Sequence, residues 1–386
     1  MLLTAALPAL RIRSSQPLLP EAPEPVVRRY RRWPKPVAVT ALAGALLAAI
    51  TVGAVGSKNL DAGATTLPEK AHASAEAFFG RYADPGGRIV RRDQGGDTVS
   101  EGQAYGMLLA VAVDDQARFS SIWGWARDHL QLQDGLLATQ WSGGKVVNPQ
   151  PATDADLDAA RALVLAGRRF GSPAYTAAGT EIGEAVLDHE TATIGGHSVL
   201  VAGPWGVQPP VINASYFSPR AYADLNAARP DPRWDELAAT SRSILASLTD
   251  NGTQRPPDWA TLDAGASAAE IGTLARPIPS PSSPGASGGA YGLDAARVAI
   301  RQEESCVAAD RKIAAALAPV ENGEGHPVFA VSAAAAEEAA GQKGSSEAML
   351  DKAATEDLQT PTYYGAAWVA LGRVMLDSSA LGTCPR

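Results

Sequence analysis

Apolar residues follow the 3.6-residue period of an α-helix through most of the chain after residue 68. The segments 104–111 and 157–164 show it well, because Ala, Leu, Met and Val recur three and four residues apart. Proline and glycine mark the breaks between such segments. The spacing predicts about a dozen helices, at 69–82, 101–114, 117–131, 154–169, 173–188, 215–227, 232–249, 290–301, 303–318, 331–340, 346–355 and 362–377.

Strand patterns are sparse in the same region. Short hairpins are expected near 141–148 and at 197–203, and the low-complexity stretch 277–289 is expected to be a surface loop. A dozen amphipathic helices without a repeat of fixed period favour a closed ring of helix pairs over an open solenoid. The sequence therefore predicts an all-α body at 69–386 with its chemistry in loops.

The first 68 residues depart from this pattern. Residues 1–35 are rich in proline and arginine, which predicts a disordered basic tail, and 57–68 form a short polar linker. Between them, 36–56 contains an uncharged run long enough to cross a hydrocarbon core of ~30 Å. Arginines directly before the run place the tail in the cytoplasm. We expect an uncleaved signal-anchor, with a cleaved signal peptide as the alternative, so the body would be extracytoplasmic, either anchored or secreted.

Charge narrows the partners of the body. Residues 1–60 hold eight Lys and Arg against two Asp and Glu, whereas the rest holds 25 against 39, a net charge of −14. A body this acidic is a poor nucleic-acid binder, because cationic patches supply most of that affinity. A neutral or cationic ligand suits it better.

Cysteine and histidine usage bears on disulfides and metals. Cys306 and Cys384 are the two cysteines, and the sequence is compatible with one disulfide between them or with two free buried thiols. The five scattered histidines form no zinc-binding pattern, so neither a metal nor another cofactor is predicted.

Two segments carry candidate chemistry. In the first, Ser100 is expected to cap a helix and to place Glu101 at its positive end, after a glycine-rich turn that a ligand can approach. In the second, 151–158, three carboxylates fall within five residues, and Asp154 or Asp156 is expected to be a helix N-cap. Helix-start electrostatics and capping are the alternative explanations for both segments.

Read together, 100–114 and 153–170 resemble the signature of glycoside hydrolase family 8, which comprises inverting endo-β-1,4-glycanases that act on cellulose, chitosan or xylan. The pattern Ala-(Ser/Thr)-Asp-(Ala/Gly)-Asp stands at 152–156 and leads into an apolar helix that ends on Phe170. Ala159 departs from it, since the family usually has Ile or Met there. The likeness continues at 215–219, 257–259, 291–297 and 363–365.

The resemblance implies an (α/α)6 barrel of about twelve helices with short β-hairpins in its loops. By the same likeness, Glu101 is the general acid, Asp154 the carboxylate that binds and distorts the sugar, and Asp294 the general base, as in members associated with cellulose biosynthesis. For Asp294, capping of the following helix is the alternative. Inversion requires an acid that stays protonated and an ionised base ~6.5–9.5 Å away, on the opposite face of the sugar.

Residues for substrate binding follow from how proteins hold sugars. Aromatic rings stack on the sugar faces, for which the candidates are Tyr105, Trp141, Trp205, Tyr216 and Tyr363. Gln103 offers a polar group for a hydroxyl, and Arg297 would position Asp294 through a charge-assisted hydrogen bond.

The predicted function is therefore an inverting endo-acting hydrolase of a β-1,4-linked glucan outside the cytoplasmic membrane. Its partners would be that polysaccharide, the membrane through the N-terminal helix, and a cell-envelope glucan synthesis machinery. The alternatives are a chitosanase or xylanase of the same family, or a non-catalytic membrane-tethered glycan-binding protein.

Overall fold

The computed structural model describes residues 67–263, 265, 271, 275–281 and 288–382. All of these belong to one unit of the chain, Asp61–Arg386. The predicted tail at 1–35, the membrane segment at 36–56 and the linker up to residue 66 lie outside the described residues. Within the described part, no helix has both the length and the apolar character that a membrane span requires.

Twelve α-helices form among the described residues. They are α1 (Glu69–Tyr82), α2 (Ser100–Ala112), α3 (Gln116–His129), α4 (Thr153–Arg169), α5 (Pro173–His189), α6 (Pro219–Ala228), α7 (Pro232–Leu248), α8 (Arg297–Glu303), α9 (Ala308–Leu317), α10 (Pro327–Ala339), α11 (Lys343–Gln359) and α12 (Tyr363–Asp377). All but two begin within four residues of the predicted starts. The exceptions are the segments predicted at 290–301 and 303–318, where α8 and α9 begin later.

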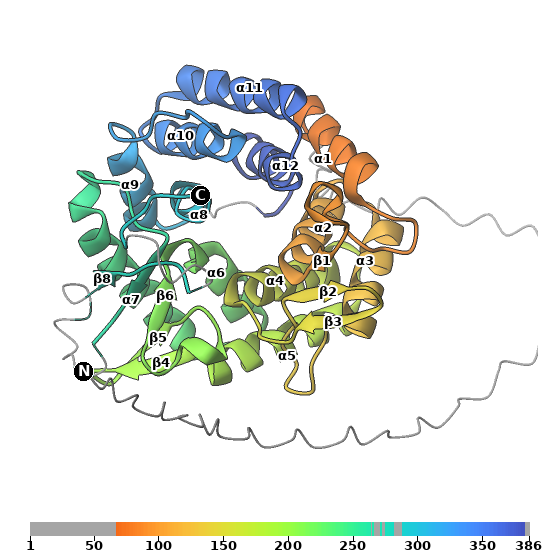
Figure 1. Ribbon diagram of the computed structural model, residues 1–386, viewed down its shortest axis with the longest axis horizontal. Coiled ribbons are helices and arrows are strands. Elements are labelled where there is room, and N and C mark those ends of the chain that lie inside the picture. The colour runs from red at the N-terminus through yellow and green to blue at the C-terminus, as the bar shows by residue number, and fades with distance from the viewer. Residues whose placement is uncertain (1–66, 264, 266–270, 272–274, 282–287, 383–386) are drawn as a thin grey trace, which may run out of the picture. The chain divides into compact units, whose positions relative to one another are not determined.

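The even-numbered helices form an inner ring and the odd-numbered helices an outer one (Figure 1). Each inner helix contacts the next inner helix along the chain, and α12 returns to contact α2, which closes the ring. Outside it, α3 packs on α2, α5 on α4, α7 on α6, α9 on α8 and α11 on α10, while α1 packs on α12. This arrangement of six helix pairs is the predicted (α/α)6 barrel.

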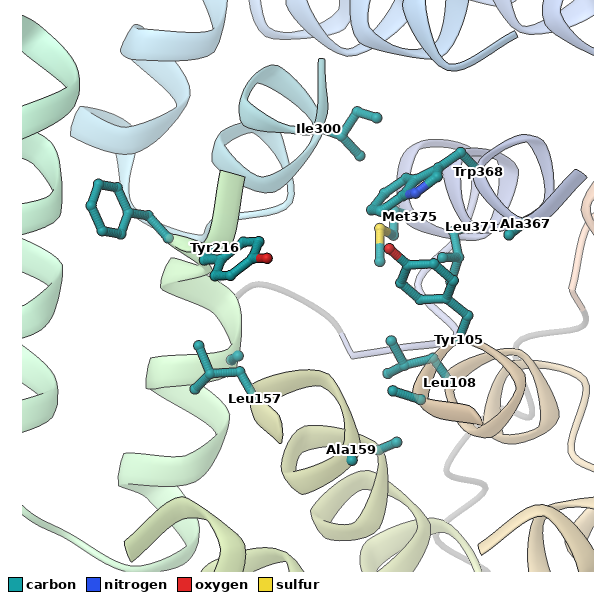
Figure 2. Close-up of a cluster of buried hydrophobic side chains, with 14 of the residues drawn as sticks. Tyr105, Leu108, Leu157, Ala159, Tyr216, Ile300, Ala367, Trp368, Leu371 and Met375 are labelled. Carbon is teal, nitrogen blue, oxygen red and sulfur yellow. The ribbon is translucent and has the colours of Figure 1, made fainter. Parts of the chain in front are cut away.

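Composition explains which helices lie inside. Twelve of the fifteen residues of α12 are buried, against four of the seventeen of α11. A helix that is apolar on all sides has to be enclosed, whereas one with a single apolar stripe can cover a surface. In Figure 2, Tyr105, Leu157, Ile300 and Trp368 project from four inner helices into one buried cluster, so side chains fill the barrel.

Charged pairs inside the barrel fix the register of α4 against α8. The helices are joined at successive turns by Asp154–Arg297 at 2.6 Å, Asp158–Arg301 at 2.8 Å and Arg161–Glu304 at 2.6 Å. Because the residue numbers increase in both helices from one pair to the next, the two helices run parallel. Their first residues consequently meet at the same end of the barrel.

Short strands connect the helices. They form three antiparallel sheets: β1 (Thr98–Val99), β2 (Gln140–Ser142) and β3 (Lys145–Asn148); β4 (Thr191–Ile194) and β5 (His197–Leu200); β6 (Val211–Asn213), β7 (Trp259–Thr261) and β8 (Arg276–Pro277). The hairpin expected near 141–148 is thus confirmed as β2–β3. The segment 197–203 contributes only β5, and its hairpin partner β4 precedes it. The third sheet was not predicted.

Three predicted helices are several residues shorter than expected, and one of them, predicted at 303–318, is α9 at Ala308–Leu317. In the segment 215–227, a 3₁₀ turn at Ala214–Tyr216 comes first, and α6 begins only at Pro219, a residue suited to the first turn of a helix. In the segment 290–301, residues 290–292 are irregular and turns occupy 293–296, before α8 begins. Of the loop predicted at 277–289, residues 282–287 lie outside the described part.

Cys306 is disulfide-bonded. This favours the predicted disulfide over two free thiols. The expected partner, Cys384, lies outside the described residues.

Candidate active site

Three carboxylates stand where inner helices begin. Glu101 and Asp154 are the second residues of α2 and α4, and Asp294 lies three residues before α8. Strand β1 leads directly into α2, which places Glu101 at the rim of the barrel. The predicted caps are wrong: the N-cap residues of α2 and α4 are Val99 and Ala152, so Ser100, Asp154 and Asp156 all lie inside their helices.

Arg297 joins the three carboxylates. Its Nη1 donates to Asp154 Oδ2 at 2.6 Å and to Glu101 Oε1 at 3.0 Å, and its Nη2 donates to Asp294 Oδ1 at 3.0 Å. The Arg297 side chain is 1% exposed. A planar guanidinium can hold several carboxylates in one fixed arrangement, which a lysine ammonium cannot do. The three groups that are distant in the chain therefore share one cation.

Glu101 is held in a state suited to proton donation. Burial raises its pKa to about 7, the nearby charges of Asp154 and Asp294 add to the rise, and Arg297 and the Tyr105 hydroxyl oppose it. Tyr105 Oη donates to Glu101 Oε1 at 2.5 Å, and the Glu101 side chain stays 23% exposed. A carboxyl group that keeps its proton near neutral pH and still reaches solvent can act as a general acid.

The other two carboxylates differ in exposure. Asp154 is 4% exposed, and burial raises its pKa against the opposing effect of Arg297. Asp294 is 32% exposed, and its second oxygen accepts a hydrogen bond from Asn213 Nδ2 at 3.0 Å. Asp294 does not cap α8, because its carboxylate is bound by Arg297 and Asn213. The more open carboxylate is the one that water can reach.

Three of the aromatic candidates contact Arg297 or the segments that lead into α2 and α4. Trp205 is 38% exposed, and its Nε1 donates to the carbonyl of Pro151, just before α4. Trp141 is half-buried on β2, opposite Thr98 of the strand that leads into α2. Tyr216 is largely buried, with the Arg297 guanidinium 5.4 Å from its ring centroid.

The structure corrects three predicted substrate contacts. Gln103 is fully buried, and its amide bonds to the backbone of Ile89, Gly87 and Ile122, so it has no group left for a sugar. Tyr105 is also fully buried and contacts Glu101 instead of offering a stacking face. Tyr363 is 1% exposed and packs against aromatic residues of α1.

Sequence reasoning missed several neighbours of the site. Tyr364, beside the buried Tyr363, is half-buried and donates to the carbonyl of Leu293 at 3.2 Å. Asn213 binds Asp294 although no motif pointed to it. Asp258 belongs to the segment 257–259 that carried part of the resemblance but received no role. Among the described residues, no group of three or more His, Cys, Asp or Glu is arranged to hold a metal ion.

Comparison with known proteins places the chain in a family. The family model described as "Glycosyl hydrolases family 8" matches residues 59–275, more than half of the chain. The chain belongs to glycosyl hydrolase family 8. A relative in Novacetimonas hansenii, named "Probable endoglucanase", is 33% identical over 201 residues, which cover 50% of this chain and 59% of that protein. The chain spans about half the length of the curated relatives it matches.

Solved structures show the same fold. The endo-β-1,4-glucanase CMCax from Acetobacter xylinum is 23% identical with a TM-score of 0.64, and the match covers 80% of this chain and 98% of that one. A β-1,3-1,4-glucanase from Paenibacillus sp. X4 is 19% identical with a TM-score of 0.69, covering 80% and 90% of the two chains. These likenesses support the (α/α)6 barrel of this family 8 protein.

Proposed function

We propose that this family 8 protein is an endo-acting hydrolase that cleaves β-1,4-linked glucan with inversion at the anomeric carbon. The observation that carries the proposal is the meeting of Glu101, Asp154 and Asp294 on Arg297, with a pKa of about 7 for Glu101. Two carboxyl groups in different protonation states are what acetal hydrolysis requires.

Each group has a distinct task. Glu101 donates its proton to the glycosidic oxygen as the bond to the anomeric carbon breaks. Asp294 takes a proton from the attacking water, for which its exposure and its two hydrogen-bond donors prepare it. Asp154, the most buried of the three, stabilises the positive charge that develops on the sugar ring.

A glucan is the favoured polymer. The proteins compared above are named as an endoglucanase and two glucanases, and Trp205 and Trp141 are incompletely buried aromatic side chains on segments next to those that carry the carboxylates. Chitosan is the second candidate, because residues 61–386, with a net charge of −14, would attract its ammonium groups. Xylan is the third.

The release of reducing ends from carboxymethylcellulose, lichenan, chitosan and xylan by the full chain tests both activity and polymer. Glu101→Gln is expected to lose about 10²–10⁴-fold in rate, the usual contribution of a general acid. Glu181→Gln, on the exposed face of α5, is the matched control and should keep full activity. Full activity of Glu101→Gln would refute the acid role, and binding of a polymer without turnover would favour the glycan-binding alternative.

Stereochemistry and mode of attack need separate measurements. Proton NMR of the first product should show the α-anomer, since inversion of a β-linkage yields it. Viscosity of carboxymethylcellulose should fall faster than reducing ends appear if cleavage is internal. A β-anomer would contradict inversion, and parallel changes of viscosity and reducing ends would contradict endo action.

We also propose that the body acts outside the cytoplasmic membrane, on external cellulose or beside a cell-envelope glucan synthesis machinery. Two observations support this: the basic residues before the uncharged run at 37–56, and the disulfide at Cys306, a bond that persists mainly in oxidising compartments. The mass of the mature protein from fractionated cells would distinguish a retained anchor from a cleaved signal. Recovery in the cytoplasmic fraction would contradict the proposal.

A further inference from the structure

Asp258 fastens the segment that carries Asp294. Its Oδ1 accepts hydrogen bonds from the backbone N–H groups of Gly292 at 3.0 Å and Ala295 at 2.8 Å. Its own N–H donates to the carbonyl of Ala290 at 2.9 Å. The segment 290–295 is thus attached at three points to one residue, which directly precedes β7.

The Asp294 side chain does not cap the helix that follows it. An aspartate just before a helix ordinarily accepts hydrogen bonds from the first backbone N–H groups of that helix. In this segment Asp258 accepts the N–H of Ala295, the residue directly after Asp294, and the N-cap of α8 is Ala296. Asp294 directs its two oxygens to Arg297 and Asn213 instead of to the backbone of α8.

The fit between Asp258 and the segment is close. A Cβ added at Gly292 would lie 2.2 Å from Asp258 Oδ2, so the backbone rests directly on this carboxylate. The two residues that hold Asp294 and its segment, Asn213 and Asp258, lie side by side in the structure. Asn213 at the end of β6 pairs with Trp259 at the start of β7, and Asp258 directly precedes Trp259. Asn213 therefore binds the Asp294 carboxylate, while Asp258 binds the backbone on both sides of Asp294.

We propose that Asp258 is a positioning residue, which holds Asp294 in the orientation needed to activate water by binding the backbone N–H groups on both sides of it, those of Gly292 and Ala295. This inference rests on the proposed function, since it assumes that Asp294 is the base. Asp258 acts through backbone hydrogen bonds and does not itself exchange a proton with substrate or water.

Kinetics of two variants test the proposal. Asp258→Ala is expected to lower kcat on carboxymethylcellulose about 10–100-fold with less than about a threefold change in KM, because misplacement of a reacting group by ~1 Å costs that order of rate. Asp258→Asn keeps an oxygen acceptor and is expected to stay within about threefold of the wild type. Asp263→Ala is the matched control, as Asp263 also accepts a backbone N–H, that of Gly265 at 2.9 Å, but is exposed.

Hydrogen exchange gives a measurement that does not depend on activity. The amides of Gly292 and Ala295 should exchange at least about tenfold faster in Asp258→Ala, and at the wild-type rate in Asp258→Asn and Asp263→Ala. Unchanged exchange of these amides in Asp258→Ala would overturn the positioning role of Asp258, whether or not the enzyme is active. Inactivity of the wild type on all polymers would instead refute the proposed function.

Azide separates positioning from a direct role as base. In an Asp294→Ala variant, azide can attack the anomeric carbon while Glu101 protonates the leaving oxygen, which yields an α-glycosyl azide without any base. We expect this rescue for Asp294→Ala and not for Asp258→Ala. Rescue of Asp258→Ala, equal losses in Asp258→Ala and Asp258→Asn, or full activity of Asp258→Ala would each overturn the proposal.

Discussion

Arg297 decides the electrostatics of the site at the scale of single residues. It is buried, it binds all three carboxylates through two different nitrogens, and Tyr216 and Trp368 lie within 6 Å of its guanidinium. A single cation among three carboxylates leaves an excess of negative charge. Burial is the main cause of the raised pKa of Glu101, the excess negative charge adds to the rise, and Arg297 limits it.

The first prediction concerns the pH dependence of the rate. Glu101 works in its protonated form, and its pKa is raised to about 7, so kcat/KM should fall as the pH rises through about 7. Initial rates between pH 4 and 9 would measure this alkaline limb. A rate that stays constant to pH 9 would contradict the acid role of Glu101.

The second prediction concerns stability. Since the folded pKa of Glu101 lies above the unfolded value of ~4.3, the folded state binds the extra proton, and the stabilisation is lost as the pH rises through 7. Glu101→Gln lacks this dependence. The free energy of unfolding of Glu101→Gln, taken relative to that of the wild type, should therefore rise by up to about 3 kcal/mol from pH 4.5 to pH 8. Urea unfolding of both proteins at the two pH values would measure this. An equal difference at the two pH values would contradict the raised pKa.

The third prediction concerns Arg297→Lys. A lysine ammonium is a compact charge that cannot bridge both sides of the cluster, so the rate should fall about 10²-fold. Arg118→Lys is the control, because Arg118 pairs with Glu76 at 2.6 Å between outer helices. Wild-type activity in Arg297→Lys would show that the fork geometry is unimportant.

Single residues also mark the limits of sequence reasoning. Tyr363 and Tyr364 are adjacent and chemically alike, yet one packs against α1 and the other lies beside Leu293. Gln103 sits in a helix that is buried almost all round, where polarity does not tell which side a residue faces. The direction in which a side chain points depends on the neighbouring helices, and a local sequence pattern does not show where those helices lie.

At the scale of elements, periodicity predicted the helices well because most are amphipathic or wholly apolar. It failed before α8, where 290–292 are irregular and 293–296 form turns, and where Asp258, a residue more than thirty positions away, binds the backbone. The sheet β6–β7–β8 was missed for a similar reason, since its strands have two or three residues and β6 pairs with β7 across about fifty positions. Neither feature leaves a local signal.

The fourth prediction tests the packing of α4 against α5. A Cβ at Gly179 would lie 2.6 Å from the carbonyl oxygen of Ala160 and 2.9 Å from Leu163 Cβ, so Gly179→Ala should cost about 1–3 kcal/mol in the free energy of unfolding. Gly80→Ala is the control, because a Cβ on that exposed face of α1 meets nothing within 4 Å. It should stabilise the protein by about 0.5–1 kcal/mol. Equal effects in chemical denaturation would contradict the close approach of the two helices.

At the scale of the whole molecule, the meeting of the carboxylates could be expected from the family resemblance but not from hydrophobic pattern. Residues 101, 154 and 294 lie in three separate helical segments, and nothing in the periodicity links them. The ring closure from α12 to α2 and the charged pairs between α4 and α8 bring them together.

That dependence on closure has a consequence for heating. Glu101, Asp154 and Asp294 stand at the starts of different inner helices, and one guanidinium spans them only while the ring is shut. Slight thermal loosening would separate the groups while each helix stayed wound. Turnover should therefore disappear several degrees before circular dichroism registers any loss of helix. Inactivation would then be the earliest sign that the inner ring has opened.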